Sequence, residues 1–541
     1  MVTDTRIEVL LVGIDAACAE VLDPLIESGA VPTIAELTET GVSGPLTSQI
    51  PPWTASAWPS LYTGTNPGKH GVFGFLGYDG YDWDVVNATH VDEPSLWELA
   101  DRRGLSSVVV NVPVTSPPTE IDGAVVPGYT APENPPCYPD GILDELRGAI
   151  GEYRVYPDED AEQPGEYVSL IEQRGDAFRY LADRFEPDFG FLQFQQTDSV
   201  FHEYPDDCYA EEGEGMVEAI YRAVDREIGV ILDEFDVGTV LLASDHGMGP
   251  YEGYEFRVNE FLREEGFVET TQGGMPAWLP ILNDSLRDGE TDTQSGPGLA
   301  GTAVATAAKL GVTPARAGRL LRAVRLDGVA ASLVPAQAQR AGREGVDFAD
   351  STAYVRSWIE LGVRINLAGR EPDGVVLEEE YESVREELIQ LLSDVRTPDG
   401  EPVFEEVTRR ESYFDGPHVD DAVDVVTVPR NFETMLSADL KGEPFGPPAE
   451  PWNHKMEGLL VASGDAVESE EVGEAQLFDV APTVCSALSI PRSDRMDGQV
   501  LPFVRETRTQ TYEGEGRDRR GTDDEVVEGR LAALGYLEGS E

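Results

Sequence analysis

Residues 239–249 read TVLLASDHGMG, a short run that favours a strand and is followed by an acidic residue, a histidine and glycines. Similar apolar runs occur at residues 7–14, 107–112, 189–194, 422–428 and 458–462. Continuous apolar strands are typical of a parallel sheet that is buried on both faces. Amphipathic helical patterns lie between them, at residues 94–103, 167–185 and 215–235. The alternation predicts an α/β fold with a doubly wound, mostly parallel sheet flanked by helices.

The strand and helix pattern divides the chain into four parts. Residues 1–270 and 348–505 are predicted to form one α/β domain in two pieces. Between them, residues 271–347 join a linker rich in Gly, Asp and Thr to Ala/Arg/Leu-rich stretches such as residues 315–324, which predicts a helical insertion or cap. Residues 506–541 are predicted to be a polar C-terminal tail with a short helix.

The charge of the chain is strongly acidic. Its 541 residues include 102 Asp and Glu against 39 Lys and Arg, a formal net charge of −63. Lysine occurs only at Lys69, Lys309, Lys441 and Lys455. Such a surface suits molar salt, where the Debye length is about 3 Å, so we expect a protein from a halophile. The same charge repels nucleic acid and argues against a nucleic-acid partner.

The chain carries no recognisable membrane or export signal. Its N-terminus, MVTDTRIEVLLVGIDA, is too short an apolar run to span a bilayer and lacks the charged region and cleavage site of a signal peptide. We therefore expect a cytoplasmic protein with no membrane partner. The four cysteines are scattered without a C-x-x-C pair, so neither a thiolate metal cluster nor a disulfide framework is indicated.

Three predicted strands lead into side chains that bind metals well, and a fourth follows one. These side chains are Asp15 after residues 7–14, Asp198 and His202 after 189–194, Asp245 and His246 after 239–243, and His454 before 458–462. In open α/β sheets, functional groups gather at the carboxyl ends of the strands. Three carboxylates and three imidazoles suit two divalent cations, most simply Zn²⁺, with Mn²⁺ as the alternative.

Each of these residues also has a plainer explanation by itself. Asp15 could cap a helix, Asp198 and His202 could form a surface contact one helical turn apart, and His454 could be a loop residue. The chain has only six histidines, however, and three of them fall in these strand-end motifs. That concentration favours the metal site. Three hydroxyls after residue 50, on Thr54, Ser56 and Ser60, are candidates for a nucleophile.

The same residues, in the same order, resemble the alkaline phosphatase superfamily. The motifs are VGIDA, WTASAWPSLYTGTNPGKHG, DSVFH, SDHG and a late histidine, and further similar stretches extend the resemblance over residues 5–505. Within the superfamily the chain is most similar to the type I phosphodiesterase and nucleotide pyrophosphatase branch, especially its group of predicted phosphohydrolases or phosphomutases.

The resemblance implies a hydrolase of phosphate esters that acts through Thr54. Asp15, Asp245 and His246 would hold one metal, and Asp198, His202 and His454 the other, with Thr54 between them as nucleophile and as a ligand. Attack by Thr54 on phosphorus would give a phosphothreonine that water then hydrolyses. The expected partner is a small-molecule phosphate ester, and the oligomeric state is left open.

Two departures limit what the resemblance implies. Nucleotide pyrophosphatases have an Asn shortly after the His-Gly pair that matches His70 and Gly71, whereas this chain has Phe75 there, so nucleotide specificity is not implied. We assign His70 to loop structure. The related sulfatases need a C-x-P-x-R setting that Thr54 lacks. Two alternatives stay open: a phosphomutase of the same superfamily, and a metal-binding scaffold protein without turnover.

Overall fold

Strand β1 (Arg6–Ile14) lies inside an eight-stranded sheet, with β7 (Phe189–Phe194) and β8 (Asp236–Ala243) on either side. The structure is a computed structural model that describes residues 5–157, 165–206, 208–209, 215–272, 344–468, 472–512 and 525–533. The strand order is β21-β2-β20-β8-β1-β7-β5-β6. The bounds of the other strands are Val42–Thr47 for β2, Ser107–Val110 for β5, Gly123–Val126 for β6, Glu457–Gly464 for β20 and Ala475–Gln476 for β21.

The sheet is mostly parallel, as predicted. β1 pairs in parallel with both β7 and β8, and β5 pairs in parallel with β6 and β7. One predicted strand differs in direction: residues 458–462 belong to β20, which runs antiparallel to both β2 and β8. An apolar run that is buried on both faces carries no mark of strand direction, because direction depends on how the chain returns to the sheet.

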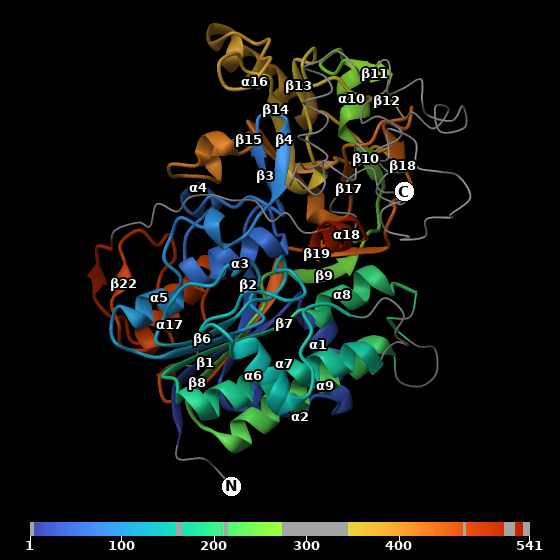
Figure 1. Ribbon diagram of the computed structural model, residues 1–541. Helices are drawn as coiled ribbons and strands as arrows, with labels where there is room; N and C mark the ends of the chain where they lie inside the picture. The colour runs from blue at the N-terminus through green and yellow to red at the C-terminus, as the bar shows by residue number, and fades with distance from the viewer. Residues whose placement is uncertain are drawn as a thin grey trace, which may run out of the picture.

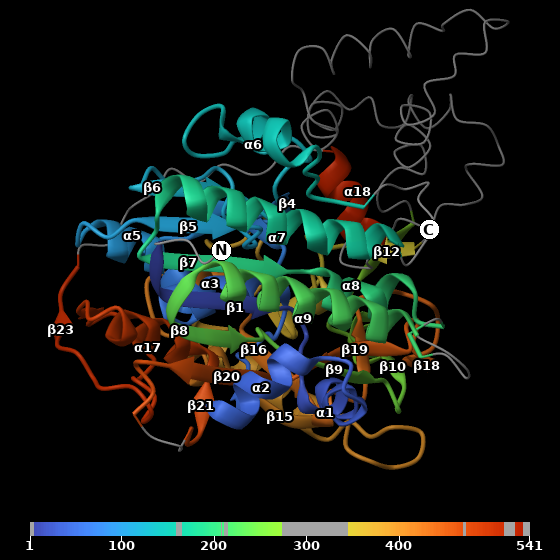
Figure 2. The same cartoon turned by 90° about the horizontal axis from the view of Figure 1, so that it is seen from below.

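Helices cover both faces of the sheet. Figure 2 shows α7 (Gly165–Phe185) and α9 (Met216–Glu234) side by side across one face, where they contact each other and the strands. On the opposite face, above the main sheet in Figure 1, lie α3 (Thr54–Thr63), α5 (Leu96–Asp101) and α17 (Val480–Ala487). A hydrophobic core lies on each face of the sheet. Alternate residues of β1 point into them, with Leu10 and Val12 in the core on the α7 side and Val9 and Leu11 in the core on the α3 side.

A second lobe stands above the main sheet in Figure 1. It contains a four-stranded sheet in the order β13-β14-β16-β15, with antiparallel neighbours, and helix α16 (Glu378–Ser393) packs on it. The strands are Ala353–Tyr354, Gly362–Ile365, Val425–Pro429 and Phe404–Arg409 in that order. The prediction that residues 422–428 belong to the main sheet was wrong, because residues 425–428 of this run lie in β16 of the second lobe. It is buried throughout, so its pattern resembles that of a central parallel strand.

The predicted helical insertion at residues 271–347 lies almost wholly outside the described residues, which omit 273–343. At its two ends, β11 (Thr270–Gln272) pairs antiparallel with β12 (Glu344–Val346), so the chain leaves and returns at one place. Helix α18 (Glu525–Ala533) is the last described element, and its Val527 and Leu531 are buried. Within the described part of the chain, no helix has the length and apolar character needed to cross a bilayer.

Candidate active site and metal centre

The predicted site residues meet at the carboxyl edge of the main sheet. Adjacent parallel strands β1, β7 and β8 end there, and the residues follow them directly or lie on helix α8 (Gln196–Glu203) after β7. Strand β19 (Trp452–Lys455) brings His454 to the same edge by pairing with β9 (Gly247–Pro250). The His202 side chain is 2% exposed, and the others are equally buried: Asp15, Thr54, Asp198, Asp245, His246 and His454.

The first group of candidate ligands consists of Asp15, Asp245 and His246. The Nε2 atom of His246 lies 3.4 Å from Oδ1 of Asp15 and 3.3 Å from Oδ2 of Asp245. The Nδ1 atom of His246 lies 2.9 Å from the backbone oxygen of Gly247, to which a neutral imidazole donates. Nε2 then carries the lone pair that a metal ion needs.

The second group consists of Asp198, His202 and His454. Oδ1 of Asp198 lies 3.4 Å from Nε2 of each histidine, and the two Nε2 atoms lie 3.2 Å apart. The Nδ1 atom of His454 lies 2.8 Å from the backbone oxygen of Pro52. Its ring also stacks on that of His246, with centroids 3.6 Å apart. Ligand atoms of Asp198, His246 and His454 lie within 4.8 Å of one another, so His246 is within reach of both groups.

Several buried polar atoms of these residues have no hydrogen-bond partner. They are Oδ1 of Asp15, Oδ1 of Asp198, Oδ2 of Asp245, Nε2 of His246 and Oγ1 of Thr54. A buried carboxylate oxygen without a partner is costly, at about 1–3 kcal/mol or more. Five such atoms at one edge of a sheet are explained if cations bind among them. The donors, carboxylate oxygen and imidazole nitrogen, fit borderline divalent ions such as zinc.

The electrostatics of the site also favour bound cations. Burial raises the pKa of Asp15 well above its usual range, and the charges of Asp245 and Asp198 raise it further. Burial and Asp198 likewise raise the pKa of Asp245, and burial lowers the pKa of His246. Burial alone would lower the pKa of His202, but the carboxylates of Asp198 and Glu450 together more than offset it and raise the value to about 10. Buried carboxylates that resist ionisation side by side are stabilised by positive charge.

Two side chains that the sequence reasoning missed hold Asp15 in place. Its Oδ2 accepts hydrogen bonds from Nε1 of Trp58 at 3.1 Å and from Nε2 of Gln193 at 2.8 Å, which leaves Oδ1 directed at the ligand cluster. Gln193 in turn accepts from Nδ2 of Asn111 at 2.9 Å. A signal for Gln193 was present, because it is the one polar side chain in the strand FGFLQF. Partners of this kind orient metal ligands and adjust their basicity.

Among the three hydroxyl candidates, Thr54 differs from the two serines. Ser56 donates to the backbone oxygens of Pro51 and Trp53, at 3.1 and 3.2 Å. Ser60 bonds Gln49 and lies 2.8 Å from Nε2 of His70. Thr54, in contrast, is the first residue of α3 and its hydroxyl is unpaired. The ring centroid of the adjacent Trp53 lies 4.9 Å from that of His454, so the start of α3 packs against the ligand cluster.

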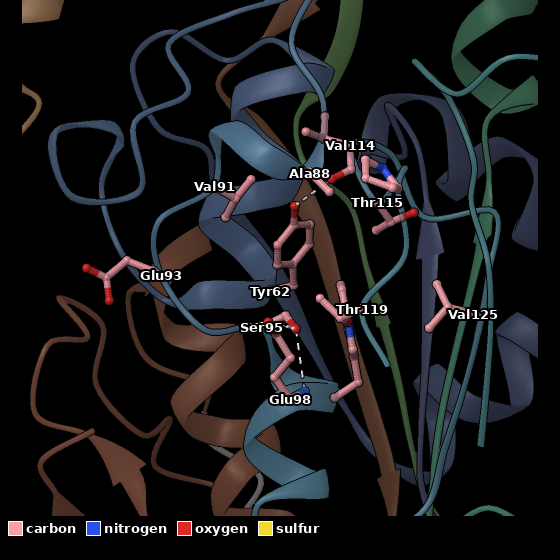
Figure 3. Close-up of a pocket in the computed structure, with 12 residues that line it drawn as sticks. Tyr62, Ala88, Val91, Glu93, Ser95, Glu98, Val114, Thr115, Thr119 and Val125 are labelled. Atoms are coloured by element: carbon pink, nitrogen blue, oxygen red, sulfur yellow. Dashed lines mark hydrogen bonds between the residues drawn. The ribbon is translucent and has the colours of Figure 1, made fainter. Parts of the chain in front are cut away.

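The other residues considered in the sequence lie in structural contacts. His70 is the last residue of the short helix α4 (Pro67–His70) rather than a loop residue, and its Nδ1 atom accepts a hydrogen bond from the Val72 amide. Phe75 is buried in the core, with its ring centroid 6.0 Å from that of Tyr129. The described residues line a cavity of about 10 Å³ beside α3, shown in Figure 3, whose lining includes Tyr62, Ser95 and Glu98. It has room for about one water molecule and contains none of the candidate ligands.

Comparison with known protein families assigns the chain to a family. The sequence profile of type I phosphodiesterase / nucleotide pyrophosphatase matches residues 9–458, a span that includes all seven site residues. The chain therefore belongs to the type I phosphodiesterase and nucleotide pyrophosphatase family, within the alkaline phosphatase superfamily, as the motifs predicted. The family and the candidate ligands together support a hydrolase of phosphate esters.

Solved structures share the fold at low sequence identity. Phosphonoacetate hydrolase from Sinorhizobium meliloti 1021, in complex with phosphonoformate, aligns with a TM-score of 0.54 at 16% identity, over 90% of this chain and 96% of the other. Murine ectonucleotide pyrophosphatase / phosphodiesterase 5 aligns with a TM-score of 0.46 at 12% identity, over 90% and 95%. The first similarity confirms the alkaline phosphatase-like fold. No curated protein sequence matches the chain.

Proposed function

We propose that the protein is a two-metal hydrolase of phosphate esters, with Thr54 as its nucleophile. The observation that carries the proposal is the set of buried atoms without a hydrogen-bond partner on Asp15, Asp198, Asp245, His246 and Thr54. Four of these atoms are metal-ligand atoms, and the fifth is a hydroxyl at the start of a helix. A structural cluster would satisfy such atoms with hydrogen bonds, whereas a metal centre keeps them available.

The ligands divide between two cations by proximity. Asp15, Asp245 and His246 would hold one ion, and Asp198, His202 and His454 the other. Two divalent cations, when bound, lower the pKa of a nearby hydroxyl and neutralise charge on a phosphoryl group. The mixture of three imidazoles with three carboxylates favours Zn²⁺ over the harder Mg²⁺, with Mn²⁺ as a second choice.

The chain supplies the other parts of the reaction. The Thr54 oxygen attacks phosphorus, the bond from phosphorus to the leaving oxygen breaks, and a phosphothreonine remains for water to hydrolyse. Thr54 begins α3, a helix of ten residues, so the positive end of the helix dipole favours the phosphoryl anion. Burial of the site strengthens these interactions, because few water molecules screen them.

The proposal is tested by hydrolysis of bis-p-nitrophenyl phosphate and p-nitrophenyl phosphate in molar KCl with added Zn²⁺ or Mn²⁺. We expect turnover by the wild type, loss of turnover in Thr54→Ala and after EDTA treatment, and retention in Ser56→Ala, whose hydroxyl donates to backbone oxygens. A preference for the diester would define a phosphodiesterase. Transfer of the phosphoryl group to an added alcohol rather than to water would favour the phosphomutase alternative.

The acidity of the chain supports a further part of the proposal, a cytoplasm with molar salt. A net charge of −63 opposes folding at low ionic strength through self-repulsion, and salt screens that repulsion. The melting temperature is therefore expected to rise steeply between 0.1 and 2 M KCl, concentrations at which the Debye length falls from about 10 Å to about 3 Å or less. An unchanged melting temperature would contradict adaptation to salt.

A further inference from the structure

Glu450 lies beside the metal-ligand cluster on the segment that leads into β19. The next residues fix this segment against the end of α8. The indole nitrogen of Trp452 donates to the backbone oxygen of Pro205 at 3.3 Å, and its ring centroid lies 5.4 Å from that of Phe201. The position of Glu450 relative to His202 is therefore set by packing between two elements that are far apart in sequence.

The carboxylate of Glu450 contacts the outer side of the His202 ring. Oε2 of Glu450 lies 3.2 Å from Nδ1 of His202, whereas Nε2 of the same ring faces Asp198 and His454. The Glu450 side chain is 26% exposed and that of His202 only 2%. Glu450 thus stands between the buried ligand cluster and solvent, on the side of the imidazole that a cation would not occupy.

The three imidazoles of the site share this arrangement, but their partners differ. The Nδ1 atoms of His246 and His454 lie against the backbone oxygens of Gly247 and Pro52, at 2.9 and 2.8 Å. The corresponding partner of His202 is a side chain. A backbone oxygen remains whatever side chain is substituted, whereas the carboxylate of Glu450 can be removed by mutation. Among the three imidazoles, the effect of the Nδ1 contact can therefore be measured only for His202.

We propose that Glu450 is a positioning residue that fixes the tautomer and the ring orientation of His202 for metal binding. By accepting the Nδ1 proton, the carboxylate leaves the Nε2 lone pair directed at the position shared with Asp198 and His454. A charged acceptor also makes the imidazole a better donor to the metal. This inference rests on the proposed function, because it assigns Glu450 to one of the two metal positions.

The test is zinc binding to the full chain in molar KCl, measured by equilibrium dialysis with Zn²⁺ for the wild type, Glu450→Ala and Glu450→Gln. In Glu450→Ala, one of the two zinc ions should bind about 10–100-fold more weakly, while the other keeps its affinity. In Glu450→Gln, the affinity for that zinc ion should lie between those of the wild type and of Glu450→Ala, because the amide oxygen still accepts the Nδ1 proton but carries no charge. With Co²⁺ in place of Zn²⁺, the visible spectrum of Glu450→Ala should change in the bands of one ion only.

A matched control is Glu506→Ala, which removes an exposed carboxylate that pairs with Arg492 at 2.8 Å, and should leave both zinc affinities unchanged. Equal binding of both ions by Glu450→Ala and the wild type would overturn the inference. So would equal weakening of both ions together with a lower melting temperature of the metal-free variant, since that result indicates a structural role. A wild type that binds no zinc and hydrolyses no ester would instead overturn the proposed function, and the role of Glu450 with it.

Discussion

Gly13 sits where no side chain can be added without moving Trp58. A Cβ atom built on Gly13 would lie 2.4 Å from Cη2 and 2.8 Å from Cζ3 of Trp58, and 3.1 Å from Cγ of Gln193. Both neighbours donate to Oδ2 of Asp15, and Trp58 is fully buried. The substitution Gly13→Ala therefore displaces the indole and breaks its hydrogen bond to the carboxylate.

The expected loss of stability has two parts. Overpacking of a filled core costs about 1–3 kcal/mol. A lost hydrogen bond to a charged group costs about 1.5–3 kcal/mol more. Together they give a decrease of about 2.5–6 kcal/mol in the free energy of unfolding. Because Asp15 is no longer held by Trp58, zinc affinity should also fall about 10–100-fold.

The assay is urea unfolding in molar KCl, with and without EDTA, combined with zinc dialysis. The control is Gly148→Ala, at an exposed position of helix α6 (Ile142–Ile150) where an added Cβ meets nothing within 4 Å. This change should raise stability by about 0.5–1 kcal/mol through helix propensity. A free energy of unfolding for Gly13→Ala within about 0.5 kcal/mol of the wild-type value, together with equal zinc affinity, would contradict the expected displacement of Trp58.

Three further predictions concern the nucleophile, the metals and a buried ion-pair network. Thr54→Ala should lower kcat by at least about 10³-fold while dialysis still finds both zinc ions, since Thr54 is one ligand among several. EDTA should lower the melting temperature, because zinc at about 100 times its Kd contributes about 2.7 kcal/mol per site. Burial would raise the pKa of Asp424, but hydrogen bonds from Arg370 lower it to about 2. Since this value lies below that of the unfolded chain, the carboxylate stabilises the fold above about pH 4, and its contribution of about 2 kcal/mol is lost as the pH falls toward 2. The stability of Asp424→Asn, measured by urea unfolding, should therefore vary less with pH in this window, and equal slopes would contradict the ion-pair account.

The sequence predicted the fold where local pattern decides it. The strand at residues 189–194 has the predicted bounds, and the helical pattern at residues 94–103 contains α5, which begins at Leu96 directly after its N-cap Ser95. Direction and partnership of strands are not local properties, which explains why β20 is antiparallel and β16 lies in the second lobe. Both runs are apolar, and burial alone produces that pattern.

The candidate ligands followed from their places at strand ends, and the structure brings them together at one edge of the sheet. Their supporting contacts could not be predicted in the same way. Trp58 and Gln193 reach Asp15 from elements 43 and 178 residues away, and Glu450 reaches His202 across 248 residues. Such contacts depend on the packing of separate elements, so no spacing in the sequence records them. The roles of the ligands and of Thr54 stay predictions.

In the proposed reaction, Thr54 carries the phosphoryl group during turnover. The most direct measurement is acid quenching of the zinc-loaded enzyme while it hydrolyses bis-p-nitrophenyl phosphate, followed by mass spectrometry of its peptides. We expect a phosphoryl group on Thr54 and none on Ser56 or Ser60, with no labelled peptide from Thr54→Ala. Turnover at the wild-type rate by Thr54→Ala, or a phosphoryl group found on another residue, would contradict it.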